Sequence, residues 1–260
     1  MAKEPRLIGS LQRAFDILDL FDHQTIELGI TEIANALDLH KSTASGLVYT
    51  LEANNYLEQN LHNRKYRLGL KLVERSSIVL GRLEIRQVAA PYLNHLRDWS
   101  QESVNLAIRD WNEVIYIERI LSNQNLVFRN EIGKRAYVHT AALGKAMIAQ
   151  LPTDEAREIL ESYEFRAMTE YSLMTVDAVM DDLELTRERG FALDDQENEL
   201  GGRCVSAPIF NHLGVAFAAV SISVPLPRIP PERIDYFGAK VKEVAAEISE
   251  RLGYRIKVLS

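Results

Sequence analysis

The sequence has little cysteine and no long apolar run. Its one cysteine, Cys204, excludes an intramolecular disulfide and is typical of a reducing compartment. No apolar segment approaches the roughly 18–20 residues that span a bilayer. The first ten residues, MAKEPRLIGS, lack the apolar core of a secretion signal. No cysteine and histidine spacing indicates zinc. We therefore expect a cytoplasmic protein without membrane partner, metal or cofactor.

The chain also lacks an excess of positive charge. It carries 30 Lys and Arg against 37 Asp and Glu, a net charge of −7. The first 90 residues carry 11 of each, so the whole acidic excess falls in the remainder. An acidic remainder would be repelled by a polyanion, so any nucleic-acid binding must be local to the N-terminal part. We therefore expect a homodimer or tetramer that presents several binding modules.

Residues 31–57, TEIANALDLHKSTASGLVYTLEANNYL, predict two short helices joined by a tight turn at residues 38–40. Thr31 is expected to cap the first helix. The second helix buries its apolar side, and its other side carries small, polar or basic residues, namely Lys41, Ser42, Thr43, Ser45 and Tyr49. Such a face fits the major groove of DNA and predicts a recognition helix. An ordinary helical hairpin with a solvated face is the alternative.

The sequence that follows predicts a wing. Residues 57–60 and 64–68 form short strand-like runs around a polar tip. Arg64, Lys65 and Arg67 are expected to lie along phosphates. An amphipathic helix over residues 10–18, with Ser10 as a plausible cap, comes first. Three helices and a hairpin predict a winged helix-turn-helix domain over residues 1–69.

The remainder predicts an α+β domain over residues 91–260, in which helices lie on an antiparallel sheet. A linker helix is expected over residues 70–90, and Pro91 is expected to end it and to start the next helix. Strands are expected over residues 103–109, 114–120, 126–129, 191–194, 203–209 and 215–223. Helices are expected over residues 139–150, 153–162, 175–189 and 231–252.

Six segments, in this order, carry a family resemblance: SLQRAFDIL, TEIANALDLHKST, YRLGLKL, HTAALGKAMIAQLP, ERGFALDDQENELGGRCVSAPIF and GVAFAAVSISVP. From Ser10 to about Gly253 the chain resembles the IclR (isocitrate lyase regulator) family of bacterial transcription factors. The resemblance implies a GAF-like effector domain, palindromic DNA operators bound by dimers or dimers of dimers, and small organic acids or aromatic catabolites as effectors. Gly46 stands where the family's recognition helix usually has arginine, so a bidentate arginine–guanine contact is not available there.

An effector site is expected on the sheet of the second domain. The helix start after Thr140 consists of small residues, and its free N–H groups attract an anion. Ser221 and Ser223 are two apart on a strand and so face the same way. With the positions that the resemblance adds, the expected effector residues are Phe128, Ala136, Ala142, Leu143, Asp194, Gly202, Cys204, Ser221 and Ser223. We expect a small organic acid as the ligand.

Other interpretations stay open at this point. Cys204 with His139 or His212 would suit an enzyme, although nothing orients the base and no oxyanion hole is evident. A sensor without specific DNA binding is a further alternative, because Gly46 weakens the recognition face. The serines, Cys204, His139 and Asp194 each have a purely structural interpretation. A ligand-responsive transcriptional regulator without enzymatic activity, more plausibly a repressor than an activator, accounts for most of the pattern.

Overall fold

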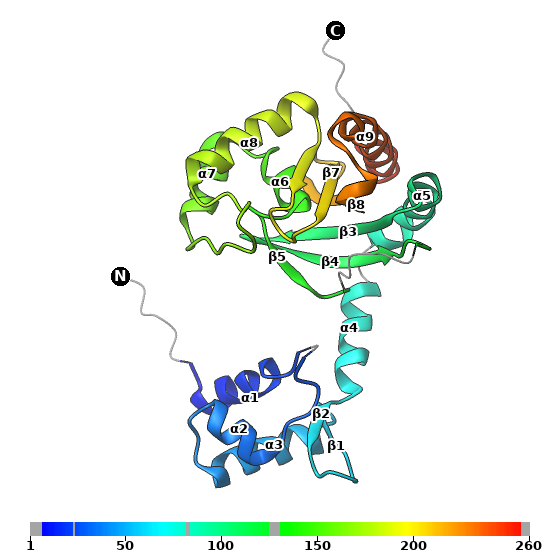
Figure 1. The fold of residues 1–260 in the computed structure, drawn as a ribbon. Coiled ribbons are helices and arrows are strands. Elements are labelled where there is room, and N and C mark those ends of the chain that lie inside the picture. The colour runs from blue at the N-terminus through cyan, green and yellow to red at the C-terminus, as the bar shows by residue number, and fades with distance from the viewer. Residues whose placement is uncertain (1–6, 23, 82–83, 125–130, 256–260) are drawn as a thin grey trace. The chain divides into compact units, whose positions relative to one another are not determined.

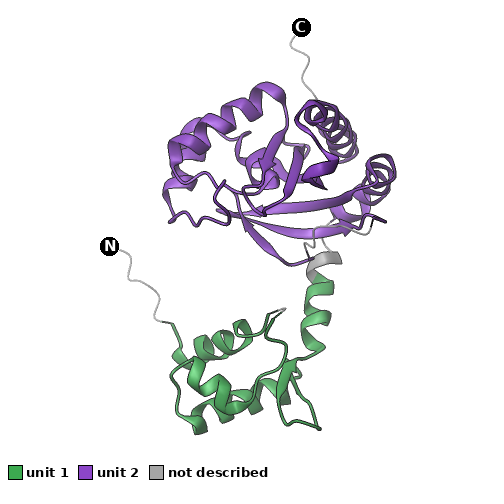
Figure 2. Ribbon diagram, in the orientation of Figure 1, with its two compact units in different colours: residues 1–82 green, residues 83–260 purple. Residues whose placement is uncertain are grey.

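The structure, a computed structural model, describes residues 7–22, 24–81, 84–124 and 131–255. It divides into two units, residues 1–82 and 83–260, each with its own core (Figure 2). No helix in the described residues is long and apolar enough to cross a membrane.

The first unit is a winged helix-turn-helix, as predicted (Figure 1). Its elements are α1 (Gly9–Asp19), α2 (Ile30–Ala36), α3 (Lys41–Ala53), β1 (Leu57–Gln59), β2 (Tyr66–Leu68) and α4 (Lys71–Gly81). Strands β1 and β2 pair antiparallel, and Leu28 adds a bridge to Tyr66. Residues from α1, α2, α3 and the wing form one buried core, including Ile17, Ile33 and Val48.

The second unit is an antiparallel sheet covered by helices, so the predicted α+β class is confirmed. Its helices are α5 (Glu84–Ser100), α6 (Ala142–Ile148), α7 (Thr153–Glu161), α8 (Val176–Arg189) and α9 (Ile234–Arg251). Its strands are β3 (Ser103–Asp110), β4 (Glu113–Ile120), β5 (Arg135–Tyr137), β6 (Ala192–Asp195), β7 (Gly202–Phe210) and β8 (Ala216–Pro225). The strand order is β5-β4-β3-β8-β7-β6.

The two faces of this sheet bury different cores. Leu106 and Val220 pack with α5 and α9 on one face, whereas Ala107 and Ala219 pack with α6, α7 and α8 on the other. The alternation follows from the two-residue period of a strand. The second face carries a group of buried polar residues on β3, β7 and β8, among them Asn105, Ser221 and Ser223, and this is where the candidate site lies.

The predicted helix boundary at Pro91 is wrong. Helix α5 runs from Glu84 to Ser100 with Pro91 inside it, so no helix ends at residue 90 and none begins at Pro91. Pro91 is exposed, while Ile85 and Leu93 on either side of it are buried. A proline inside a helix costs about 3 kcal/mol, and each buried apolar side chain contributes about 1.5–3 kcal/mol. The continuous apolar stripe therefore outweighs the proline.

Two predicted caps are also wrong. Helix α2 begins at Ile30, so Thr31 lies inside its first turn and Gly29 is the N-cap residue. The Glu32 carboxylate accepts the Gly29 backbone N–H at 2.6 Å, which supplies the capping that Thr31 was expected to give. Ser10 likewise lies inside α1, which Ile8 precedes. The bridge at Leu28 brings the chain directly into α2 and leaves no room for a cap at Thr31.

Two further differences affect the second unit. Helix α6 is shorter than the predicted residues 139–150, because the Thr140 and Ala141 N–H groups both bond to the Tyr137 carbonyl in a tight turn before it. Strand β5 was not predicted. The strand predicted over residues 126–129, with Phe128, lies outside the described residues.

Candidate DNA-binding face and effector site

One side of α3 carries the expected DNA-contacting residues. Ala44, Val48 and Leu51 anchor the opposite side in the core of the first unit. The residues on the outward side are Lys41, Ser42, Thr43 and Tyr49, all exposed, and Ser45, which is half-buried. His40 caps the helix, since its Nδ1 accepts the Ser42 backbone N–H at 3.4 Å. The helix start therefore presents small hydroxyl side chains and one cation to solvent.

The wing contains charges that are mostly matched within the first unit. Lys65 Nζ lies 2.9 Å from Glu32 Oε1, and Arg67 lies 2.9 Å from Glu58. The Gly29 N–H, and then Lys65, hold the pKa of Glu32 below its usual range. Arg64 is exposed, and no ion pair links it to another described residue. Arg64 and Lys41 are therefore the expected DNA contacts whose charge no described acid neutralises.

Four buried polar residues and the half-buried Cys204 meet on the α6 side of the sheet, and we call these five the polar floor: Asn105, Asp194, Cys204, Ser221 and Ser223. Cross-strand pairing sets Asp194 opposite Cys204 and Cys204 opposite Ser223. The Cys204 thiol donates to Ser223 Oγ at 3.2 Å. Asn105 Nδ2 donates to the same oxygen at 3.0 Å and to Ser221 Oγ at 3.3 Å. The predicted polar residues thus converge.

The sequence prediction missed Asn105. It is fully buried on β3 between Val104 and Leu106, which belong to the opposite core. The signal was a polar residue in the middle of a predicted apolar strand. Only the pairing of β3 with β8 brings that residue to Ser221.

Asp194 is a buried carboxyl group and not a solvated turn. Its Oδ1 accepts the backbone N–H groups of Glu197 at 2.7 Å and Asn198 at 3.2 Å. Burial, and then the nearby Glu197 carboxylate, raise the pKa of Asp194 to about 7. The group therefore titrates near neutral pH. The neighbouring Asp195 faces the other way and pairs with Arg203 at 2.7 Å.

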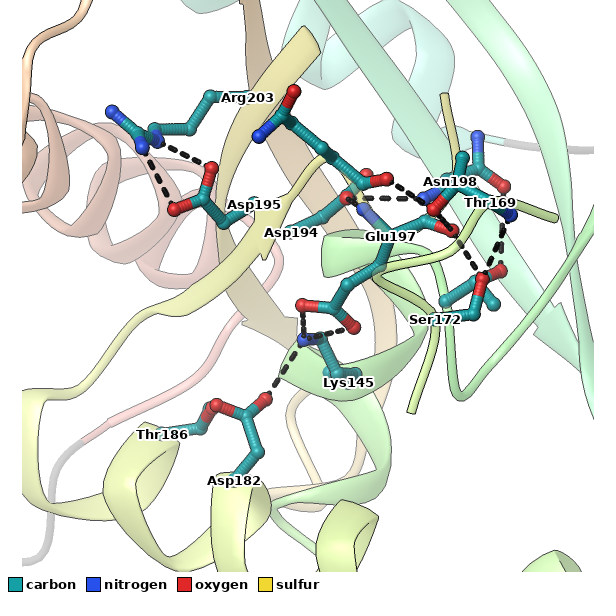
Figure 3. Close-up of polar contacts among 12 residues, drawn as sticks. Lys145, Thr169, Ser172, Asp182, Thr186, Asp194, Asp195, Glu197, Asn198 and Arg203 are labelled. Atoms are coloured by element: carbon teal, nitrogen blue, oxygen red, sulfur yellow. Dashed lines mark hydrogen bonds and ion pairs between the residues drawn. The ribbon is translucent and has the colours of Figure 1, made fainter. Parts of the chain in front are cut away.

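A buried ion-pair network fixes the loop that holds Asp194 (Figure 3). Lys145, on α6, has no exposed surface and contacts Glu197 at 2.7 and 2.8 Å and Asp182 of α8 at 2.8 Å. Burial alone would lower the pKa of Lys145, but these two carboxylates together raise it above its usual value. The Ser172 hydroxyl donates to the Glu197 carbonyl at 2.7 Å. The network ties α6, α8 and the β6–β7 loop into one support.

Helix α6 brings its first turn against this support. Ala142 and Leu143 occupy that turn and are buried, and the first N–H groups of a helix have no intrahelical acceptor. A Cβ at Gly144 would lie 2.4 Å from Val138 Cα, so only glycine allows this approach. Ala136 is buried on β5, and Gly202 begins β7 on the same side of the strand as Cys204.

The cysteine–histidine pair that an enzyme would need is not formed. His139 Nδ1 bonds to the Tyr163 hydroxyl at 3.0 Å, its ring stacks on Phe165, and burial lowers its pKa to about 4. Burial also raises the pKa of the Cys204 thiol, which bonds to Ser223 and not to a histidine. His139 is thus a structural, neutral histidine. Among the described residues no cluster of three or more potential metal ligands occurs.

The fold and the two sites define a class: a protein with a winged helix-turn-helix unit and a sheet unit that contains a buried polar site. Known proteins match it. Residues 10–61 match the IclR helix-turn-helix domain, and residues 77–250 match the bacterial transcriptional regulator IclR C-terminal domain. The chain therefore belongs to the IclR family of transcriptional regulators, which carry a DNA-binding helix-turn-helix and a C-terminal effector domain.

Individual relatives agree with this assignment. The chain is 40% identical to the HTH-type transcriptional regulator XynR of Escherichia coli (strain K12), over 95% of this chain and 98% of XynR. It is 30% identical to the transcriptional repressor IclR of the same strain, over 95% and 90% of the two chains. A crystal structure of an IclR homolog complexed with 4-hydroxybenzoate, from Microbacterium hydrocarbonoxydans, shares 25% identity and a TM-score of 0.79, over 94% and 98%.

Proposed function

We propose that this protein is a repressor that binds a palindromic operator as a homodimer or a dimer of dimers, and that a small organic acid controls its affinity for DNA. The observation that carries the proposal is the pairing of an exposed polar helix face on α3 with a separate, buried polar floor in the second unit. The first arrangement suits DNA and the second suits a small ligand.

The DNA contacts divide by chemistry. Lys41 and Arg64, together with Lys65 and Arg67, bind phosphates and hold the register. The residues that reach base edges are Ser42, Thr43, Ser45 and Tyr49. Thr31 is exposed in the first turn of α2 and contacts the backbone. Because Gly46 supplies no side chain, base recognition rests on hydroxyl groups and is tolerant of single base changes.

An apolar stripe on the first unit supports a dimer. Ile8, the residue before α1, and Leu11 and Phe15 within it are spaced by three and four residues and are 67%, 53% and 51% exposed. Large apolar side chains gathered on one face of a soluble unit mark an interaction surface. A second copy that covers them places two recognition helices on a two-fold axis, which matches a palindromic operator.

The chemistry of the polar floor supports an acid as effector. The first turn of α6 has N–H groups without an intrahelical acceptor, and α6 packs on β8, the strand that carries the two serines. Arg119 lies opposite Asn105 in the sheet and adds a cation on the same face. The Microbacterium homolog was crystallised with an aromatic hydroxy acid, 4-hydroxybenzoate. The repressor role is supported by the name of the E. coli relative and by the simple block that a bound dimer imposes on a promoter.

Fluorescence anisotropy on the DNA upstream of the protein's own gene tests the proposal. We expect binding that is selective over an unrelated duplex of equal length, that weakens steeply as salt rises and that changes when an organic acid is added. A genome-wide selection extends the search if the first fragment fails. Equal binding to every duplex would instead favour the sensor without specific DNA binding.

A further inference from the structure

Asn105 lies at the β3 end of the polar floor, and its hydrogen bonds are incomplete. Its side chain has no exposed surface. In the sheet it stands opposite Ser221 on one side and Arg119 on the other. Its amide nitrogen uses both of its hydrogens, one for Ser221 Oγ at 3.3 Å and one for Ser223 Oγ at 3.0 Å.

These bonds fix what the two serines can do. A serine oxygen has two lone pairs and one hydrogen. Ser223 Oγ accepts from both Asn105 and the Cys204 thiol, so its lone pairs are occupied and its hydrogen is left to be donated. Ser221 Oγ also accepts from Asn105 and keeps its own hydrogen. Asn105 therefore turns both hydroxyl groups into donors for a ligand.

The other end of the same amide lacks a partner. Asn105 Oδ1 is buried and accepts no hydrogen bond from any described residue. Buried carbonyl oxygens almost always have a donor. The neighbouring serine hydroxyls are already held by the amide nitrogen, and Asp194 accepts backbone N–H groups. The site thus offers two hydroxyl donors and one unused acceptor side by side.

We propose that Asn105 is the specificity-determining residue of the effector site and that it selects a hydroxy acid. The effector carboxylate accepts the hydrogens of Ser221 and Ser223, and a hydroxyl group on the carbon next to the carboxylate donates to Asn105 Oδ1. An unsubstituted acid or a 2-oxo acid satisfies the serines but leaves Oδ1 unpaired. This inference rests on the proposed acid effector and adds the substituent that the acid must carry.

Isothermal titration of the full-length wild-type protein tests the selection. The probes are the 2-hydroxy, 2-oxo and unsubstituted acids of three, four and five carbons, with both enantiomers of each hydroxy acid. A buried acceptor left without a donor lowers affinity markedly, so the hydroxy acid should bind about tenfold tighter or more. The ratio of the two affinities is measured on the wild-type protein alone.

The variant Asn105→Ala then assigns the ratio to this side chain. We expect it to bind the hydroxy and unsubstituted acids with affinities within about twofold of each other. Binding of the unsubstituted acid shows that the Asn105→Ala variant is folded. If the alanine variant does not fold, Asn105→Ser replaces it in the same measurement. The matched control is Ser206→Ala, which lies on the same face opposite Ser221 but whose hydroxyl already donates to the Val220 carbonyl at 2.9 Å. It should keep the wild-type ratio.

The outcomes separate this inference from the proposed function. Equal binding of all three acid classes by the wild-type protein, or a hydroxyl preference that survives Asn105→Ala, overturns the role of Asn105 and leaves the acid effector intact. A preference for the 2-oxo acid that depends on Asn105 overturns it as well, because the amide would then act as a donor. If no acid of any length binds, the acid effector itself is wrong and this inference fails with it.

Discussion

The two units place their polar functional groups in opposite environments. In the first unit they are on the surface: Lys65 and Glu32 form an ion pair whose side chains are 39% and 49% exposed. In the second unit Lys145, fully buried, holds Glu197 and Asp182. Exposed pairs contribute little and exchange partners easily, whereas breaking a buried pair leaves a charge without solvent. The exposed lysine of the first unit can therefore exchange its carboxylate partner for a phosphate group, whereas the buried ion pairs of the second unit must already be formed in the free protein.

The largest effect should come from breaking the buried network. Lys145→Met leaves Glu197 without its cation and Asp182 with only Arg189 at 3.5 Å, and removal of one partner from a buried pair costs about 3–5 kcal/mol. Chemical denaturation followed by circular dichroism measures the loss. The matched control is Lys65→Met in the exposed pair, which should leave the unfolding midpoint of the first unit unchanged. Equal effects of the two variants would remove the contrast between the units.

The next effect concerns the approach of α6 to the chain before it. Gly144→Ala places a Cβ 2.4 Å from Val138 Cα, which is backbone and cannot move aside as a side chain can. Overpacking of this kind costs about 1–3 kcal/mol. This outweighs the roughly 1 kcal/mol by which alanine stabilises a helix relative to glycine. Thermal unfolding should therefore show a destabilised second unit.

Gly46→Ala, at an exposed position of α3, is the matched control for Gly144→Ala. No atom lies within 4 Å of a Cβ there, so this variant should be slightly stabilising. A Gly144→Ala protein as stable as wild type would show that the α6 start can shift, which would weaken the case for a preformed site.

The pH dependence of effector binding sharpens the contrast further. Asp194, with a pKa raised to about 7, is neutral below that pH and anionic above it. The groups around it are Glu197, Glu199, Lys145 and the Cys204 thiol. An organic acid stays ionised from pH 6 to 8, so its affinity should fall as pH rises through about 7, by up to about tenfold per pH unit. Titrations across this range measure it.

Asp194→Asn should remove that dependence while leaving the acid bound. A wild-type affinity that does not change between pH 6 and 8 would mean that the carboxylate of the effector lies away from Asp194.

The smallest effects are expected on the DNA-binding face. Lys41→Ala and Arg64→Ala should each weaken operator binding a few-fold and lower the slope of log affinity against log salt by about 1. Arg67→Ala should do less, because Glu58 already holds Arg67 at 2.9 Å. Anisotropy titrations over a salt series compare the three variants. A larger effect of Arg67 than of Lys41 would show that the wing pairs open completely on DNA.

The local pattern of the sequence determined most of the elements. The period of apolar residues predicted α2, α3, the wing, the β3–β4 hairpin and the later strands. Helix α8 ends at Arg189, the last residue of the predicted range, and Gly190 follows in the left-handed conformation. These features depend on neighbours along the chain, which periodicity records. The residues that we propose as DNA contacts, such as Lys41 and Tyr49, could be predicted for the same reason, because a helix leaves them outside its apolar stripe.

Only the tertiary structure decided the rest. Pro91 remains inside α5 because residues on both sides of it are buried by the rest of the second unit. Asn105 reaches Ser221 and Ser223 from more than a hundred residues away, through the pairing of β3 with β8. Lys145 finds Glu197 and Asp182 in the same way. Burial and cross-strand pairing join residues that no local pattern connects, and they set the chemistry of the polar floor.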